Sequence, residues 1–81
     1  MSIRVLFFAS MADISGAREI RVDAAGLTDV DSVFNKFVGD FPLLEKYRKS
    51  VLLAVNSEFA RPGSPVHDGD EIAFFPPVSG G

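Results

Sequence analysis

The sequence contains no cysteine, no tryptophan and a single histidine, His67. Without cysteine the chain forms no disulfide, offers no thiolate to a metal and has no cysteine nucleophile. A catalytic histidine needs a positioned partner and a nucleophile, whereas His67 stands beside Asp68 in a segment typical of a turn. We interpret it as a solvated loop residue. The sequence therefore favours a carrier or binding module over an enzyme with an internal active site.

Positive charge is also scarce. Eight Lys and Arg against eleven Asp and Glu give a net charge of −3, whereas nucleic-acid modules normally carry a basic face. The only basic cluster is Lys46, Arg48 and Lys49, which the solvated end of a helix explains. No apolar run reaches membrane-spanning length, and the first residues lack a secretory signal. We expect a cytoplasmic protein that binds neither nucleic acid nor membrane.

Acidic residues do not form a recognisable metal site. Asp68 and Asp70 flank Gly69, but the further oxygen ligands of a calcium loop are missing. A tight turn with Gly69 at positive φ is the better interpretation. Asp29 and Asp31 are explained by the start of a helix. We expect no bound metal and no bound cofactor.

Phenylalanine, by contrast, is abundant, with eight in 81 residues, and hydrophobic residues make up 47% of the chain. One domain of this size buries only about 60–65% of its unfolded surface. Some of the phenylalanines are therefore expected on the surface as a contact patch.

Short apolar segments predict strands at 3–9, 18–23, 51–56 and 71–75. Apolar and polar residues alternate cleanly at 18–23, whereas 3–9 and 51–56 are nearly continuous apolar runs, which indicates buried strands. Residues 10–17 are predicted to form a connection that includes a helical turn. Between the second and third strands, apolar residues recur at helical spacing: Val30, Val33, Phe34, Phe37 and Val38.

The ends of this helix also carry signals. We expect Thr28 as its N-cap, with Asp31 completing a capping box, and Gly39 as its C-cap. Pro42 then opens a short second helix. Its predicted apolar side consists of Leu43, Leu44 and Tyr47.

The order strand, strand, helix, strand, strand predicts an α+β fold in which one mixed sheet packs on one main helix. This order matches the β-grasp, or ubiquitin-like, fold, in which the first and last strands lie side by side in the middle of the sheet. The predicted core is Ile3, Val5, Phe7, Val22, Val33, Phe37, Val55, Ile72 and Phe74. Phe8 and Phe75 then lie on the opposite face, with Phe59 adjacent. We expect a β-grasp domain at 1–75 and a flexible C-terminal tail at 76–81.

The tail ends in Gly80-Gly81 after Pro76, Pro77, Val78 and Ser79. Glycine lacks a Cβ, so Gly-Gly can enter a tunnel that excludes bulkier residues. The two prolines fix φ and lack an N–H, so they end the last strand and project the tail away from it. This pattern is typical of a reactive carboxyl end that enters another protein.

Three segments resemble the small subunit of molybdopterin synthase: residues 6–9, residues 54–56 and above all residues 68–81. The resemblance covers nearly the whole chain, although residues 28–50 agree only in pattern. It implies a β-grasp sulfur carrier that acts in molybdenum cofactor biosynthesis. In that family an ATP-dependent enzyme adenylates the terminal glycine, and sulfur then replaces the acyl phosphate to give a thiocarboxylate. The large subunit of the synthase uses that sulfur to build the dithiolene of molybdopterin.

By this resemblance, Gly81 carries the reactive group and Gly80 lends reach. Phe8, Phe59 and Phe75 form an apolar docking patch, and residues 76–79 enter the partner. The chain supplies sulfur but no catalytic group; the partners supply those, and the activating enzyme uses Mg-ATP. The expected partners are this adenylating enzyme and the synthase large subunit, in a heterotetramer.

Two alternatives remain. The chain is a sulfur carrier for another pathway, such as thiazole synthesis, or a ubiquitin-like modifier joined to lysines. The Phe-Phe-Pro-Pro sequence that leads to the terminal Gly-Gly favours the molybdopterin carrier over the thiazole carrier.

Overall fold

The computed structural model describes residues 2–77. Its elements follow in the order β1 (Ser2–Phe7), α1 (Ser10–Ser15), β2 (Glu19–Asp23), α2 (Val30–Asp40), the 3-10 helix η1 (Pro42–Tyr47), β3 (Leu52–Val55), β4 (Glu58–Ala60) and β5 (Glu71–Phe75). The predicted tail residues 78–81 lie outside this range, so the division into a domain at 1–75 and a tail at 76–81 stays a prediction.

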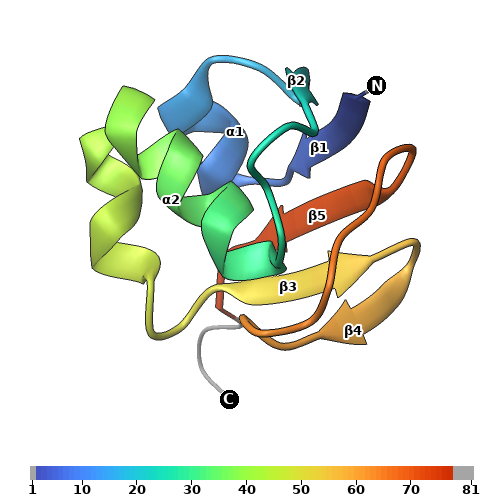
Figure 1. Cartoon of the computed structure of the whole chain (residues 1–81). Helices are drawn as coiled ribbons and strands as arrows, with labels where there is room; N and C mark the ends of the chain where they lie inside the picture. Colours follow the sequence, from blue (N-terminus) through green and yellow to red (C-terminus); the bar gives the residue numbers. More distant parts are fainter. Residues whose placement is uncertain (1, 78–81) are drawn as a thin grey trace.

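The strands form one mixed sheet in the order β2-β1-β5-β3-β4. The central pair, β1 and β5, is parallel, with Val5 opposite Ile72, and the other pairs are antiparallel. Parallel strands need a long crossover connection, and α2 and η1 lie within this one, packed over one face of the sheet (Figure 1). The predicted β-grasp arrangement, with the first and last strands side by side, is confirmed.

The core lies between the helices and the sheet and is rich in phenylalanine. The rings of Phe7 and Phe37 meet edge to face with centroids 5.0 Å apart, and those of Phe34 and Phe74 are 5.3 Å apart. Seven predicted core residues are buried: Ile3, Val5, Phe7, Val33, Phe37, Ile72 and Phe74. Val22 and Val55 are partly buried and pack against them. Met11 and Val66 are further core residues that the sequence did not predict.

The ends of α2 differ from the prediction. Asp29, not Thr28, is the N-cap, because its Oδ1 accepts a hydrogen bond from the Ser32 N–H at 2.8 Å. The Oγ of Ser32 accepts from the Asp29 N–H in return, so Ser32 rather than Asp31 completes the capping box. The helix also continues past Gly39 to Asp40, with Phe41 as C-cap. It ends there because a residue that precedes proline, as Phe41 does, avoids the helical conformation.

Pro42 opens η1 as predicted, but one of the three predicted apolar contacts is wrong. In a 3-10 helix residues three apart share a face, so Leu44 is buried, Tyr47 packs against the core and Leu43 points away. Leu43 is 64% exposed.

Strand β4 was not predicted. It has only three residues, too few to show an alternation. A two-residue turn joins it to β3, with Asn56 at φ 50° and Ser57 at φ 71°. Positive φ at both central residues is the geometry that matches the twist of a hairpin.

Candidate functional site

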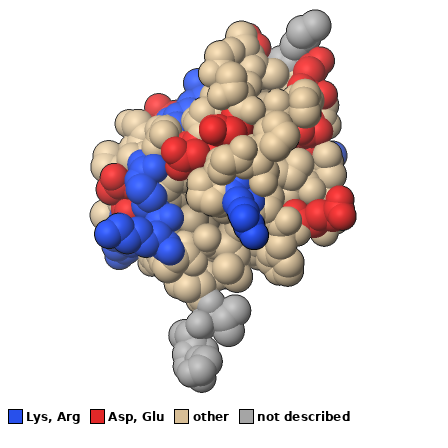
Figure 2. Space-filling view, turned by 60° about the horizontal axis from the view of Figure 1, so that its bottom comes forward, with Lys and Arg blue, Asp and Glu red and all other residues tan. Residues whose placement is uncertain are grey.

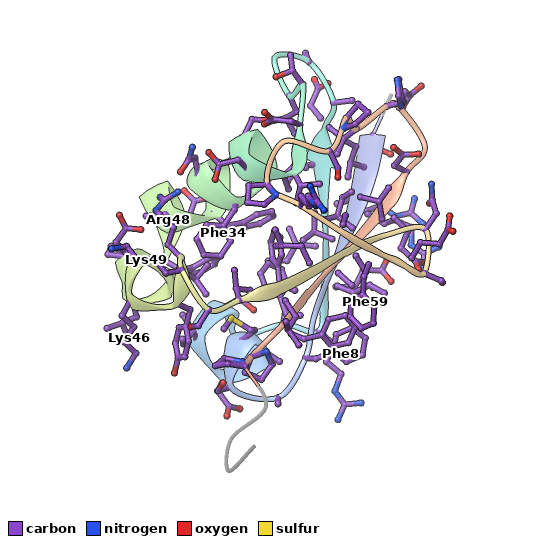
Figure 3. The ribbon with its side chains drawn as sticks, turned by 90° about the horizontal axis from the view of Figure 1, so that it is seen from below. Phe8, Phe34, Lys46, Arg48, Lys49 and Phe59 are labelled. Carbon is purple, nitrogen blue, oxygen red and sulfur yellow. The ribbon has the colours of Figure 1, made fainter. Side chains whose placement is uncertain are left out.

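The face of the sheet away from the helices carries the candidate site. Side chains alternate across a strand, so Leu6 on β1 and Ala73 on β5 share this face, while their neighbours Phe7 and Phe74 enter the core. Phe59 lies opposite Ala54 in the register of β3 and β4, which places it on the same face. Figure 3 shows Phe8 and Phe59 on this side of the sheet and α2 on the other.

Three phenylalanines meet on this face. The rings of Phe8 and Phe75 stack, with centroids 4.5 Å apart and planes 12° apart. Phe8 is 40% exposed and Phe59 81% exposed, while Phe75 is partly buried. We call Phe8, Phe59 and Phe75 the Phe patch. The structure thus brings together the three aromatic residues that the sequence predicted as a docking surface.

The Phe patch surrounds a shallow hollow of about 240 Å³. Its floor is formed by the smaller residues Leu6, Ala54 and Ala73, and Ser57 lies at one edge. Sequence analysis did not predict the contribution of Leu6 and Ala54. The signal for Leu6 was its position between the core residues Val5 and Phe7, which assigns it to the opposite face. Exposed aromatic residues around an apolar hollow are typical of a protein-docking surface.

Charged residues border the patch and pair with one another. Arg4 Nη2 lies 2.9 Å from Glu71 Oε2 and 3.5 Å from Glu19 Oε1. Arg4 and Glu71 are neighbours across β1 and β5, so the pair spans the centre of the sheet. Such half-exposed pairs contribute little stability but fix the polar edge of the apolar surface.

Strand β5 leads the chain from this face toward the predicted tail. Phe75 is both the last residue of β5 and a member of the Phe patch. Pro76 is partly buried and Pro77 exposed, and neither continues the strand. The remaining predicted site residues, Val78, Ser79, Gly80 and Gly81, lie outside the described residues. The roles of all predicted site residues stay predictions.

The turn that precedes β5 is held by a polar network. Asn56 Nδ2 donates to Asp70 Oδ1 at 3.0 Å, and Asn56 Oδ1 accepts from the Glu71 N–H at 3.0 Å. The hydrogen bond from Asn56 holds the pKa of Asp70 below its ordinary value, aided by the backbone N–H of His67 and opposed by burial. Asp70 therefore stabilises the turn, as predicted, and His67 is an exposed loop residue.

No group of three or more metal-ligating side chains was found among residues 2–77. Within the same range, no helix is both long and apolar enough to cross a membrane.

The basic cluster lies away from the Phe patch, at η1. Figure 2 shows Lys and Arg gathered on that side of the molecule, and Figure 3 places Lys46, Arg48 and Lys49 across the sheet from Phe8 and Phe59. The Arg48 guanidinium covers the Phe34 ring at 5.4 Å and contacts Asp31 at 3.4 Å and Glu45 at 2.5 Å. Arg48 thus closes one end of the core and is not free to recruit a ligand.

Known proteins are similar to this chain along nearly its whole length. A family model described as "ThiS family" matches residues 5–81. The chain is 37% identical over 83 residues to the "Molybdopterin synthase sulfur carrier subunit" of Caenorhabditis elegans, covering 100% of this chain and 99% of the relative. It is 34% identical over 95 residues to the protein of the same name from Escherichia coli, covering 98% and 99%.

Solved structures agree with the fold. The crystal structure of small archaeal modifier protein 1 from Haloferax volcanii is 36% identical, with a TM-score of 0.82 over 100% of both chains. A chain of the complex of subunits 1 and 2 of molybdopterin-converting factor from Helicobacter pylori shares the fold, with 23% identity, a TM-score of 0.66 and 100% of both chains covered. A β-grasp domain with an apolar sheet face and full-length relatives of this kind leads to one assignment: the chain belongs to the ThiS family.

Proposed function

We propose that this chain is a sulfur carrier in molybdenum cofactor biosynthesis. The observation that carries the proposal is its similarity, along its whole length, to proteins named molybdopterin synthase sulfur carrier subunit. The family match extends through Gly80 and Gly81. The exposed Phe patch beside the end of β5 supports the same function, because a carrier must present its tail while it docks.

Gly81 carries the chemistry in this proposal. A free carboxylate is a poor electrophile, so one carboxylate oxygen first attacks the α-phosphate of Mg-ATP and releases pyrophosphate. A sulfur nucleophile then displaces AMP from the acyl-adenylate, and the product is a thiocarboxylate. Its sulfur is a soft nucleophile that attacks the precursor of the dithiolene. The adenylating enzyme and the synthase large subunit supply the catalytic groups for these steps.

The Phe patch is the docking surface for both partners. Its three rings offer the large, rigid apolar contacts that dominate protein interfaces. The tail enters the partner's pocket beside them, where its backbone N–H and C=O groups need hydrogen-bond partners. With the large subunit we expect a heterotetramer, a dimer of large subunits with one carrier at each end. The expected cytoplasmic location stays a prediction.

Intact-mass measurement of the protein purified from its own cells tests the function. We expect a fraction of the chain to carry sulfur in place of one oxygen at Gly81, and this fraction to vanish when the adenylating enzyme is deleted. A chain that never carries the extra mass, even with an excess of sulfur donor, would contradict the carrier function.

A protein-modifier function is the second candidate. It is favoured by the 37% identity to small archaeal modifier protein 1 of Haloferax volcanii, over 91% of this chain. In that case Gly81 forms an isopeptide bond with lysines, and an antibody against the chain detects a ladder of larger conjugates. A growth experiment distinguishes sulfur transfer to thiazole from sulfur transfer to molybdopterin. If the chain serves thiazole synthesis, deletion of its gene creates a requirement for thiamine and leaves molybdoenzyme activity intact.

A further inference from the structure

We propose that Arg18 and the recess beside Phe8 extend the docking surface, and that they bind an apolar side chain of the partner together with a neighbouring carboxylate. This inference rests on the proposed function, since the occupant belongs to the partner that covers the Phe patch. It adds a charged, selective contact to the apolar contacts of the Phe patch.

The recess lies where β1 ends and the chain turns into α1. Its volume is about 370 Å³, and its walls include Leu6, Phe8, Ala9 and Ala12. Leu6 and Phe8 also line the hollow of the Phe patch, so Phe8 forms a ridge between two depressions. A partner that covers the Phe patch therefore reaches the recess without a second, separate interface.

The backbone holds the recess open. Ala9 has φ 51° and ψ −125°, a conformation that residues with a side chain rarely adopt. It is held by hydrogen bonds on both sides: the Met11 N–H donates to the Phe8 carbonyl and the Ala12 N–H to the Ala9 carbonyl, each at 3.0 Å. Because Ala9 and Ala12 carry only a methyl group, space is left that a larger partner side chain can fill.

The mouth of the recess carries unneutralised positive charge. Arg18 and Glu19 both line it. Glu19 is contacted by Arg4 at 3.5 Å and by Arg21 at 3.8 Å. Arg18, by contrast, is exposed and makes no ion pair with any residue between 2 and 77.

The positive charge of Arg18 determines which group of the partner the recess can bind. A guanidinium binds a carboxylate through two parallel hydrogen bonds, and the apolar walls fit an aliphatic or aromatic side chain next to that carboxylate. A polyanion such as nucleic acid is disfavoured by the net charge of −3 and by the apolar walls. The partner is therefore expected to present an Asp or Glu adjacent to an apolar residue.

The test measures the affinity of the carrier for the synthase large subunit from the same genome, by titration calorimetry. Arg18→Glu replaces attraction by repulsion, and we expect binding weaker by about tenfold or more, with an unchanged melting temperature. Lys36→Glu is the matched control, because it changes the net charge equally at an exposed position of α2 and lines neither the recess nor the hollow of the Phe patch. We expect the affinity of this control to stay within about threefold of wild type, because salt screens a charge that lies far from the interface.

A second pair of variants tests the shape. Ala12→Leu fills the recess and should weaken binding, whereas Ala25→Leu adds the same group at an exposed turn and should not. Wild-type affinity of Arg18→Glu, or equal losses for Arg18→Glu and Lys36→Glu, would overturn the inference. If the inference is overturned in this way but Phe59→Ala weakens binding in the same assay, the Phe patch still docks the large subunit and the proposed function stands. A wild-type chain that does not bind the large subunit would instead overturn the proposed function.

Discussion

At the scale of single residues, the exposed fraction of a large apolar side chain shows whether it belongs to the core, but not whether it binds a partner. Phe59 is 81% exposed on the open face of the sheet and Leu43 is 64% exposed at η1, across the sheet from it. Both are large apolar side chains that lie outside the core. Only Phe59 belongs to a cluster of aromatic residues around a hollow, so only Phe59 has a predicted role in binding.

Phe59→Ala should leave the free energy of unfolding within about 0.5 kcal/mol of wild type, as is usual for exposed positions. It should weaken binding to the synthase large subunit by about 2 kcal/mol, the size expected of an aromatic anchor. Leu43→Ala is the control and should change neither quantity. Urea unfolding and titration calorimetry measure the two effects, and equal affinity losses for the two variants would rule out the patch.

Ser57 is a residue in a conformation that suits glycine. Its φ of 71° lies in the left-handed region, which costs a residue with a Cβ about 1 kcal/mol. We therefore expect Ser57→Gly to stabilise the fold by about 0.5–1 kcal/mol, measured by urea unfolding. Asn56→Gly tests the explanation at the other turn position. It should destabilise the fold, because Asn56 also makes hydrogen bonds to Asp70 and Glu71.

At the scale of elements, what the sequence predicts depends on whether the signal is local. Short apolar segments predict β1, β3 and β5, alternation predicts β2, and helical spacing predicts α2. The pairing of β1 with β5 follows from the order of elements. The N-cap of α2 could not be predicted from the local sequence, because Thr28 and Asp29 are both good N-cap residues and contacts with the rest of the fold determine which one is used. Asp31, predicted as part of the cap, instead faces Arg48 at a distance of 17 residues along the chain.

The candidate site was predictable to a similar extent. Phe75 follows from strand alternation and Phe59 only from its resemblance to a known pattern, since β4 is too short to show a period. The recess beside Phe8 could not be foreseen. It depends on the unusual backbone of Ala9 and on the approach of Arg18 from a different part of the chain, where its carbonyl accepts from the Phe7 N–H at 2.8 Å.

The turn before β5 gives a prediction about pH. Its cause is the lowered pKa of Asp70 in the folded state, which is due mainly to the hydrogen bond from Asn56. A carboxylate with a lowered folded pKa stabilises the fold above its unfolded pKa, near 3.8, and this stability is lost as the pH falls below that value. Asn56→Ala should therefore be less stable than wild type at pH 7, and the difference should shrink toward pH 2. Urea unfolding across this range measures it, and a constant difference would contradict the role of Asp70.

At the scale of the whole molecule, the fold separates three surfaces. The helices cover one face of the sheet, the cluster of Lys46, Arg48 and Lys49 lies at η1, and the Phe patch lies on the opposite face beside the end of β5 (Figure 3). This arrangement allows a partner to hold the domain by the patch while the chain beyond Pro77 enters its active site. Docking and chemistry are then separate functions of separate segments.

The separation predicts that changes at Gly81 abolish sulfur transfer but not docking. Deletion of Gly81 should leave the melting temperature and the affinity of the Phe patch largely unchanged, because it alters neither the sheet nor the core. A short polar extension beyond Gly81 should also allow docking but block the chemistry, since the reactive carboxylate would no longer be free.

Single-turnover sulfur transfer tests the central claim most directly. The chain is charged with sulfide by its adenylating enzyme and Mg-ATP, mixed with the large subunit and the dithiolene precursor, and the molybdopterin formed per carrier is measured. We predict formation of molybdopterin in proportion to the thiocarboxylate present, and none from the Gly81 deletion or from the extended chain. Molybdopterin formed at the wild-type level by either variant would contradict the account of Gly81 as the sulfur-carrying residue.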